Sequence, residues 1–348
     1  MIMKSYNEQC PGCGSQKQQE DSTANGYFLN PHDQLCVNCF RLKNYGIKSH
    51  FVIDINIEAT LKNIKKDQDQ VILIIDILNP YQTLLSSINE YIDEENLIIV
   101  VNKIDLLPKS ISYPKIINWI RKIAIRKNIK FKKLILVSNY KKFNIDQLVN
   151  LIKNGNKNTS VIGYSNVGKS SFIVALFNAI GISTANLSAN TIGTTLAAIK
   201  TPFNDKFIID HPGFYLDGNF QNILDKKLLN KAMGKKELKQ KVFQFTPNID
   251  QVISIHNLFF LNFLQNKKPQ NYQLLFSNQL EIKKINKFKK NLSDNFVSHE
   301  LILLPNIEKQ DLIISGLGFI TLKNNHQKII IDLPKDIKFN LVESIYSS

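Results

Sequence analysis

The chain has few cysteines, a single tryptophan and no long hydrophobic run. All four cysteines lie within the first 39 of its 348 residues. No apolar stretch approaches the ~18–20 residues that a membrane-spanning helix needs, so we expect no integral membrane protein. Residues 1–10 are polar and lack the apolar core of a secretory signal, so we expect a cytoplasmic protein. With 43% hydrophobic and 21% charged residues, the composition is typical of a globular protein.

Acidic residues are also scarce: 29 Asp and Glu stand against 44 Lys and Arg, which gives a formal net charge of +15. Such an excess favours an anionic partner, such as nucleic acid or a membrane surface. The chain is also rich in Lys, Asn and Ile, a composition typical of A+T-rich coding sequence, which explains many lysines without any partner. Charge alone therefore does not identify a partner. At ~100–200 residues per domain, the length predicts two or three domains.

The cysteines form two C-x-x-C pairs, Cys10 with Cys13 and Cys36 with Cys39, separated by 22 residues. Four thiolates in this pattern can close a tetrahedral Zn²⁺ site with no open position, which makes the site structural. Free thiols and a redox C-x-x-C are the alternatives, but the rest of the chain has no cysteine. We therefore expect residues 1–50 to form a zinc-binding module that the metal folds.

Residues 51–225 alternate short apolar runs with longer amphipathic segments. Runs of this kind are typical of strands buried on both faces of a parallel sheet. We expect strands at Val71–Asp76, Leu97–Val101, Lys133–Val137, Thr159–Ile162, Leu196–Thr201 and Lys206–Asp210. We expect helices at Tyr81–Ile92, Tyr113–Lys127, Ile145–Asn154 and Lys169–Ile180. This alternation predicts an α/β fold with a doubly wound, mostly parallel sheet and ligand loops at the carboxyl ends of its strands.

Residues 163–170 match the phosphate-binding pattern G-x-x-x-x-G-K-[ST] at every position, between a predicted strand and a predicted helix. Loop amides and the helix N-terminus can surround the phosphates of a nucleotide. Lys169 would reach the β- and γ-phosphates, and the Ser170 hydroxyl would coordinate Mg²⁺. The predicted phosphate-site residues are Gly163, Asn166, Val167, Gly168, Lys169, Ser170 and Ser171.

A second motif, Asn102-Lys103-Ile104-Asp105, ends the strand at Leu97–Val101. The Asp105 carboxylate can accept from N1–H and N2–H of guanine, donors that adenine lacks. Asn102 would fix the loop and the base edge, and the Lys103 stem would cover the ring. In the loop Ser138-Asn139, which follows the next strand, a backbone amide could contact guanine O6.

The third motif is Asp210-His-Pro-Gly213. Asp210 would hold Mg²⁺ through water, and the Gly213 amide would sense the γ-phosphate. Thr195 is the predicted switch ligand for Mg²⁺ and the γ-phosphate, with Thr194 as the neighbouring alternative. A polar loop without such a role is the other interpretation. The predicted catalytic set is Lys169, Ser170, Thr195, Asp210 and Gly213.

The order of the motifs is reversed relative to most GTPases, because the guanine motif precedes the phosphate loop. If both serve one site, the sheet is circularly permuted. Two separate half-domains are the alternative, but neither would have enough strands to close its own core.

Together, the four-cysteine segment and this motif order resemble the YqeH-type circularly permuted GTPases, which are linked to ribosome assembly. The resemblance extends to Cys36–Tyr45, the Asn-Val-Gly-Lys-Ser loop and Leu229–Val242. It implies a switch that binds GTP and GDP, hydrolyses GTP with Mg²⁺, and binds rRNA or an assembling small ribosomal subunit. Where this family has Thr, Pro and a small residue, the chain has His211, Ile192 and Asn139.

Two positions bear on hydrolysis. Asn166 resembles the Asn that coordinates K⁺ in potassium-stimulated GTPases, although an Asn that caps its own loop is the alternative. Phe214 stands where Ras-like enzymes have a water-orienting Gln, so we expect slow intrinsic turnover. A nucleotide-gated RNA-binding scaffold with negligible hydrolysis is therefore the competing hypothesis. An ATP-dependent metabolic enzyme is disfavoured by Asp105.

Residues 226–348 contain alternating apolar patterns that predict a β-rich C-terminal domain. Its lysine cluster, Lys283–Lys290, is the local candidate for phosphate contacts with RNA, with Phe288 as a stacking group. A solvated helix face is the alternative interpretation. Gly316-Leu-Gly318 is expected to form a turn or bulge, with a phosphate loop as the alternative. We expect the protein to be a monomer when it is not bound to the ribosome.

Overall fold

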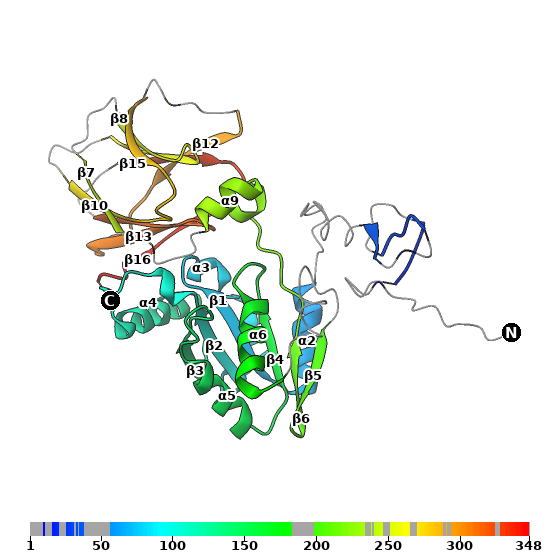
Figure 1. Cartoon of the computed structure of the whole chain (residues 1–348). Coiled ribbons are helices and arrows are strands. Elements are labelled where there is room, and N and C mark those ends of the chain that lie inside the picture. Colours follow the sequence, from blue (N-terminus) through cyan, green and yellow to red (C-terminus); the bar gives the residue numbers. More distant parts are fainter. Residues whose placement is uncertain are drawn as a thin grey trace. The chain divides into compact units, whose positions relative to one another are not determined.

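The computed structural model describes residues 10, 16–20, 26–30, 33, 35–37, 56–182, 198–233, 238, 240–245, 251–264, 270–287, 290, 294–323 and 328–347. The chain divides into two compact units, and Figure 1 labels helices and strands of both. Unit 1 comprises Met1–Ile75, Ser87–Asn102 and Phe131–Tyr215, and unit 2 comprises Asp76–Ser86, Lys103–Lys130 and Leu216–Ser348. The predicted domain boundaries at residues 50 and 225 stay predictions. Among the described residues, no helix combines the length and apolar character needed to cross a membrane.

A six-stranded sheet follows the order β3-β2-β1-β4-β6-β5. Its strands are β1 (Gln70–Asp76), β2 (Leu97–Asn102), β3 (Lys133–Leu136), β4 (Thr159–Gly163), β5 (Ile199–Phe203) and β6 (Lys206–Asp210). The pairs β1–β4, β2–β3 and β4–β6 are parallel, and β5 is antiparallel to β6. The chain builds outward from β1 to β3 and returns to place β4 beside β1. The order therefore reverses between β1 and β4, which is where ligands bind in sheets of this kind. The predicted fold class is confirmed.

The helices given for the described part of unit 1 include α2 (Ile57–Asp67), α5 (Ile145–Asn154) and α6 (Lys169–Ile180). Apolar side chains of α5 and α6 share one core with alternate residues of β1 and β2, including Ile72, Ile74, Ile98 and Val100. Both helices have the predicted bounds. The Asn56 side chain accepts a hydrogen bond from the Ala59 N–H and so caps α2, a helix that the sequence patterns missed.

The helix predicted at Tyr81–Ile92 is wrong. Only one turn forms, α3 (Pro80–Thr83), and a separate 3₁₀ turn follows at Ile88–Glu90. The Lys127 ammonium donates to the Tyr81 and Leu84 carbonyls. In a longer helix these carbonyls would instead accept from N–H groups of the next turn. Two further 3₁₀ turns lie at Glu94–Asn96 and Ile104–Leu106, and the other described helices are the long α4 (Tyr113–Arg126) and the short α8 (Phe220–Ile223) and α9 (Lys226–Ala232).

The C-terminal part of unit 2 holds two five-stranded antiparallel sheets, ordered β16-β13-β14-β10-β7 and β11-β8-β9-β15-β12. Their strands are β7 (Gln240–Phe245), β8 (Gln251–Ile255), β9 (Phe259–Phe263), β10 (Gln270–Leu275), β11 (Ile282–Asn286), β12 (Phe296–Leu301), β13 (Lys309–Ile314), β14 (Gly318–Lys323), β15 (Ile329–Pro334) and β16 (Phe339–Glu343). Buried residues of both sheets form one core, as in a β-sandwich. The β-rich prediction is confirmed.

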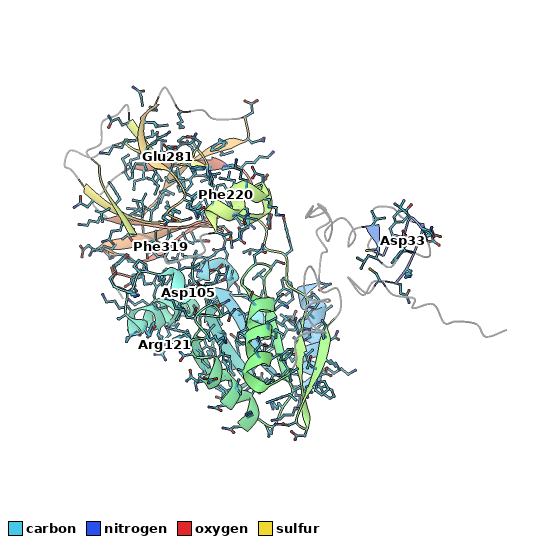
Figure 2. The ribbon with its side chains drawn as sticks, in the orientation of Figure 1. Asp33, Asp105, Arg121, Phe220, Glu281 and Phe319 are labelled. Atoms are coloured by element: carbon cyan, nitrogen blue, oxygen red, sulfur yellow. The ribbon has the colours of Figure 1, made fainter. Side chains whose placement is uncertain are left out.

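Helix α4 belongs to this unit and packs against the sandwich. The Trp119 indole N–H donates to the Glu343 carbonyl at 2.8 Å, and its ring lies 5.6 Å from the ring of Phe319. Phe319 is labelled in Figure 2. Gly316, with φ +82°, lies in the turn between β13 and β14, as expected. Because Lys283 and Lys284 lie on β11, the interpretation of the lysine cluster as a helix face is wrong.

Candidate nucleotide-binding site

The phosphate loop connects β4 directly to α6. At two of its positions only glycine fits, because a larger residue would collide with neighbouring atoms. Gly168 has φ +93°, a left-handed conformation, and an added Cβ would collide with the Asn102 amide. An added Cβ at Gly163 would lie 2.7 Å from the Ile74 carbonyl oxygen of the neighbouring strand. Asn166 also has a positive φ, +68°. The loop therefore turns back over the strand ends with its backbone close to neighbouring groups.

Two asparagine side chains hold the loop from neighbouring strand ends. The Asn102 amide donates to the Val167 carbonyl at 2.9 Å, and the Asn139 amide donates to the Gly168 carbonyl at 3.2 Å. Asn102 ends β2 and Asn139 follows β3. The first residue of the guanine motif thus contacts the phosphate loop, which supports one shared site. The side-chain role of Asn139 was missed, because the sequence pattern assigned only a backbone amide to it.

The Asn139 loop is itself closed by backbone hydrogen bonds. Ser138 and Phe143 form an isolated antiparallel bridge, and the buried Ser138 hydroxyl accepts from the Lys141 N–H at 3.0 Å. This compact turn fixes the position of Asn139 relative to β3.

The guanine motif continues into unit 2. Lys103 has φ +65°, and its ammonium pairs with the Asp76 carboxylate at the end of β1, at 2.6 Å. Asp105 follows in the 3₁₀ turn Ile104–Leu106 and is labelled in Figure 2. The pair fixes the Lys103 side chain across two strand ends. The contact between Asp105 and a guanine base stays a prediction.

Lys169 and Asp210 form the charged centre of the site. Their side chains are hydrogen-bonded and only 7% and 4% exposed. Burial raises the pKa of Asp210, and the Lys169 charge opposes this effect. In the described part of the chain, the second Asp210 carboxylate oxygen is buried without a hydrogen-bond partner. Such an oxygen, with the exposed Ser170 hydroxyl at the start of α6, is a suitable ligand set for Mg²⁺.

The predicted roles of several further site residues stay predictions. Ser171 lies on the first turn of α6 and is exposed, as is Asn166. Ile192, Thr194 and Thr195 lie outside the described residues, as do Leu196 and Ala197 at the start of the predicted fifth strand. The role of Thr195 and the K⁺ role of Asn166 stay predictions.

Residues 213 and 214 run beside the phosphate loop. The Phe214 N–H donates to the Gly163 carbonyl at 3.0 Å, and the Ser165 N–H donates to the Phe214 carbonyl at 2.7 Å. The Phe214 ring is fully buried and packs edge-on against Tyr164. Residue 214 therefore contributes to the packing of unit 1, and its apolar ring cannot orient a water molecule.

His211 makes contacts that the motif search missed. Its Nε2 lies 2.9 Å from the Ser160 hydroxyl, which donates to the Asp69 carboxylate at 2.7 Å. Burial, reinforced by the charges of Lys169 and Lys200, lowers the pKa of His211 to about 4. Burial also raises the pKa of Asp69. The sequence held a weak signal for this contact, since Ser160 is a polar residue next to Thr159 at the start of a buried strand.

In the N-terminal segment, Cys10 and Cys36 are both buried beside Phe28. The Cys36 N–H donates to the Cys10 sulfur at 3.2 Å, a contact that suits a metal-bound thiolate. Cys13 and Cys39 lie outside the described residues. Within the described part, no group of three or more His, Cys, Asp or Glu side chains is placed to hold a metal ion. The zinc site stays a prediction.

Two lysines of the cluster at Lys283–Lys290 already have acidic partners. Lys290 pairs with the buried Asp332 carboxylate, and Lys283 lies 3.3 Å from Glu281. Phe288 lies outside the described residues. The cluster therefore offers less free positive charge to RNA than its sequence indicates.

Two protein-family models match the chain. The model described as RsgA GTPase matches residues 59–217, and the model described as 50S ribosome-binding GTPase matches residues 158–289. The first match includes the guanine motif and the phosphate loop in the order found here. The predicted motif order and its GTPase assignment are confirmed.

Individual relatives agree with this assignment. "Uncharacterized protein YqeH" of Bacillus subtilis (strain 168) is 28% identical over 358 residues, covering 94% of this chain and 96% of that protein. "NO-associated protein 1, chloroplastic/mitochondrial" of Arabidopsis thaliana is 24% identical over 243 residues, covering 60% of this chain. The chain spans only 43% of the length of that plant relative.

Among solved structures, YjeQ from Thermotoga maritima is 22% identical, with 42% of this chain and 48% of that chain covered. The chain thus spans about half the length of YjeQ. The TM-score is 0.27, too low to align the two folds. The fold assignment therefore rests on the strand order described above and on the family models.

Proposed function

Because this chain is a circularly permuted GTPase of a family related to ribosome-assembly GTPases, we propose that it acts as a GTP-dependent switch in ribosome biogenesis. Its proposed target is rRNA in the assembling small ribosomal subunit. The description of one matched family as ribosome-binding supports a ribosomal partner, and its wording makes the 50S subunit the alternative target. The net charge of +15 is compatible with either.

The main support for nucleotide binding is the hydrogen bond from the Asn102 amide to the Val167 carbonyl. This bond joins the guanine motif to the phosphate loop. Lys169 would exchange its bond to Asp210 for the β- and γ-phosphates. Asp210 and Ser170, with Thr195, would then hold Mg²⁺, which neutralises the charge that develops on the transferred phosphoryl group. The amide of Gly213 would bind the γ-phosphate, so its position depends on the nucleotide state.

A covalent route leads from Gly213 to the C-terminal sheets. The chain enters unit 2 at Leu216, where the Gly218 carbonyl accepts from the Lys338 N–H at 2.9 Å and the Phe220 N–H donates to the Ser315 carbonyl at 3.0 Å. An added Cβ at Gly316 would collide with the Asn219 side chain. We propose that rearrangement at Gly213 passes along this anchored segment and changes the affinity of the C-terminal sheets for RNA.

The decisive experiment is a pull-down of the full chain loaded with GTP, GDP or a non-hydrolysable GTP analogue, followed by sequencing of the bound RNA. We expect small-subunit rRNA to be enriched in one nucleotide state. Asp105→Ala, which removes the guanine acceptor, should abolish the nucleotide dependence, whereas the exposed Asp93→Ala should retain it. Enrichment of large-subunit rRNA would instead identify the 50S subunit as the target. Recovery of no ribosomal RNA in any state would contradict the proposal.

The N-terminal module is proposed to bind one structural Zn²⁺ through Cys10, Cys13, Cys36 and Cys39. Metal analysis of the purified protein should find one zinc per chain, and Cys10→Ser should lower this content. Asn166 is proposed to hold K⁺ beside the phosphates. Equal turnover in K⁺ and Na⁺ buffers would contradict that role. A cytoplasmic location and a monomeric state off the ribosome are part of the same proposal.

The second candidate is an RNA-binding scaffold that nucleotides gate without significant hydrolysis. Phe214 favours this candidate, because its buried, apolar side chain cannot orient a water molecule for hydrolysis. Multiple-turnover assays with and without ribosomal subunits separate the two. Measurable turnover that subunits stimulate supports the switch, and its absence in both conditions supports the scaffold.

A further inference from the structure

A chain of three buried polar side chains crosses the sheet beside Asp210. Asp69 precedes β1, Ser160 lies in β4, and His211 follows β6, and these three strands are neighbours. The distances are 2.7 Å from Ser160 Oγ to Asp69 and 2.9 Å from Ser160 Oγ to His211 Nε2. All three residues are less than 10% exposed. The mechanism proposed above uses none of them.

The hydroxyl proton determines the direction of these hydrogen bonds. Ser160 has one proton, which it donates to the Asp69 carboxylate. Its oxygen can therefore only accept from His211, so the imidazole must carry a proton on Nε2. The chain runs from His211 to Ser160 to one Asp69 oxygen, while the other Asp69 oxygen is buried without a hydrogen-bond partner among the described residues. Loss of any donor would leave a buried polar atom unpaired.

These bonds hold one end of the segment at residues 211–214. The His211 N–H also donates to the Val161 carbonyl at 3.1 Å, extending the β4–β6 pairing beyond Asp210. The other end is held by the two backbone bonds of Phe214 to Gly163 and Ser165. Gly213 lies between these attachments, and an added Cβ there would approach Ser165 Oγ to 3.2 Å. The segment is thus fixed against β4 and the phosphate loop.

We propose that His211 is a positioning residue for GTP hydrolysis. By donating from Nε2 to Ser160, it holds residues 211–213 on β4, so that the Gly213 amide is in place for the γ-phosphate before nucleotide binds. The effect acts through the backbone of Gly213, and His211 itself contacts no substrate. This inference rests on GTP hydrolysis alone and is independent of the RNA target.

The kinetic test compares His211→Leu, which removes the donor, with His211→Gln, whose amide nitrogen reaches a similar position. We expect His211→Leu to lower kcat about three- to tenfold, the change that corresponds to one hydrogen bond, with KM and GDP affinity retained. His211→Gln should restore kcat. His299→Leu, in β12, is the matched control and should leave kcat unchanged. Wild-type kcat in His211→Leu, or an equal loss in His211→Gln, would overturn the proposal.

A second measurement reports the position of the imidazole proton in the wild-type protein itself. Nitrogen NMR of the wild-type protein, with His211 assigned by comparison with His211→Gln, should show the proton on Nε2 and a bare Nδ1. In Ser160→Ala this preference should weaken, and His211→Leu in the Ser160→Ala background should lower kcat no further. A proton on Nδ1 in the wild-type protein would overturn the proposal.

Discussion

The Lys169 ammonium is hydrogen-bonded to the Asp210 carboxylate, so the group assigned to the phosphates and the group assigned to Mg²⁺ neutralise each other. Both side chains are buried, and an isolated charge in such a place is costly. In the absence of nucleotide and Mg²⁺, each of the two charged side chains is therefore neutralised by the other. We therefore expect nucleotide and Mg²⁺ to bind together, because either one alone would leave one of the two charges without its partner.

Lys169→Ala tests this arrangement. Removal of the ammonium should weaken GDP binding at least about tenfold and lower GTP hydrolysis about 10²–10³-fold, because a preorganised charge at the phosphates is lost. Titration with fluorescent GDP and single-turnover assays measure the two effects. Lys62→Ala is the control, since Lys62 forms an exposed pair with Glu58 on α2. Near wild-type GDP affinity in Lys169→Ala would contradict the assignment.

Gly168 and Gly181 provide a matched pair of substitutions. Both have positive φ, +93° and +78°, so alanine strains the backbone at either position by about 1–2 kcal/mol. Only at Gly168 would the new Cβ collide with Asn102; at Gly181 the space is open. We expect Gly168→Ala to abolish measurable GDP binding and Gly181→Ala to retain it. Equal GDP affinities would show that the Asn102 contact is dispensable.

The phosphate loop and the helices at Ile145–Asn154 and Lys169–Ile180 were predictable, because their signals are local. Glycine spacing, apolar periodicity and the strand before the loop all lie within about 20 residues of chain. The error at Tyr81–Ile92 has a long-range cause, because Lys127 takes two carbonyls of that segment.

The missed contacts of the site are also long-range. The Asn139 amide reaches Gly168 only because the loop after β3 lies beside the phosphate loop. His211 meets Ser160 and Asp69 only because β1, β4 and β6 are neighbours in the sheet. A motif search reads positions along the chain, so it identified the chemistry of the loop and not the side chains that hold it.

The stability of unit 2 should depend on pH through Asp311. This carboxylate is fully buried, accepts from the Thr321 hydroxyl and the Ile345 N–H, and burial raises its pKa to about 6. The folded state then binds the proton more tightly than the unfolded state does. The free energy of unfolding should therefore fall as pH rises from about 4 to about 6, by up to about 3 kcal/mol.

Urea unfolding of the wild type and Asp311→Asn between pH 4.5 and 7 measures this contribution. The amide does not titrate, so the variant should lack this part of the pH dependence. Carbon NMR of the Asp311 carboxyl should also find its midpoint well above that of an exposed aspartate. The same pH slope in both proteins would rule out Asp311 as the source.

Ser315 should couple the nucleotide state to the C-terminal sheets. Its carbonyl accepts from Phe220, and its hydroxyl accepts from the Asn79 amide and donates to the Gln82 side chain. Ser315→Ala retains the backbone bond and removes the two side-chain bonds, so Asn79 and Gln82 lose their partner in the turn between β13 and β14. We expect GDP affinity to stay near the wild-type value while the nucleotide dependence of RNA binding falls.

Gly316→Ala should have the stronger effect, because its Cβ would displace Asn219 and so release the segment that follows Gly213. Gly155→Ala, whose Cβ would meet only ordinary contacts of 3.4 Å or more, is the matched control. RNA binding measured in GTP and in GDP gives the coupling as a ratio of affinities, and thermal unfolding reports any loss of stability. A ratio that is unchanged in a folded Gly316→Ala protein would place the coupling outside the turn. A ratio that falls toward one, with GDP affinity retained, would place it at the contact between Asn219 and Gly316.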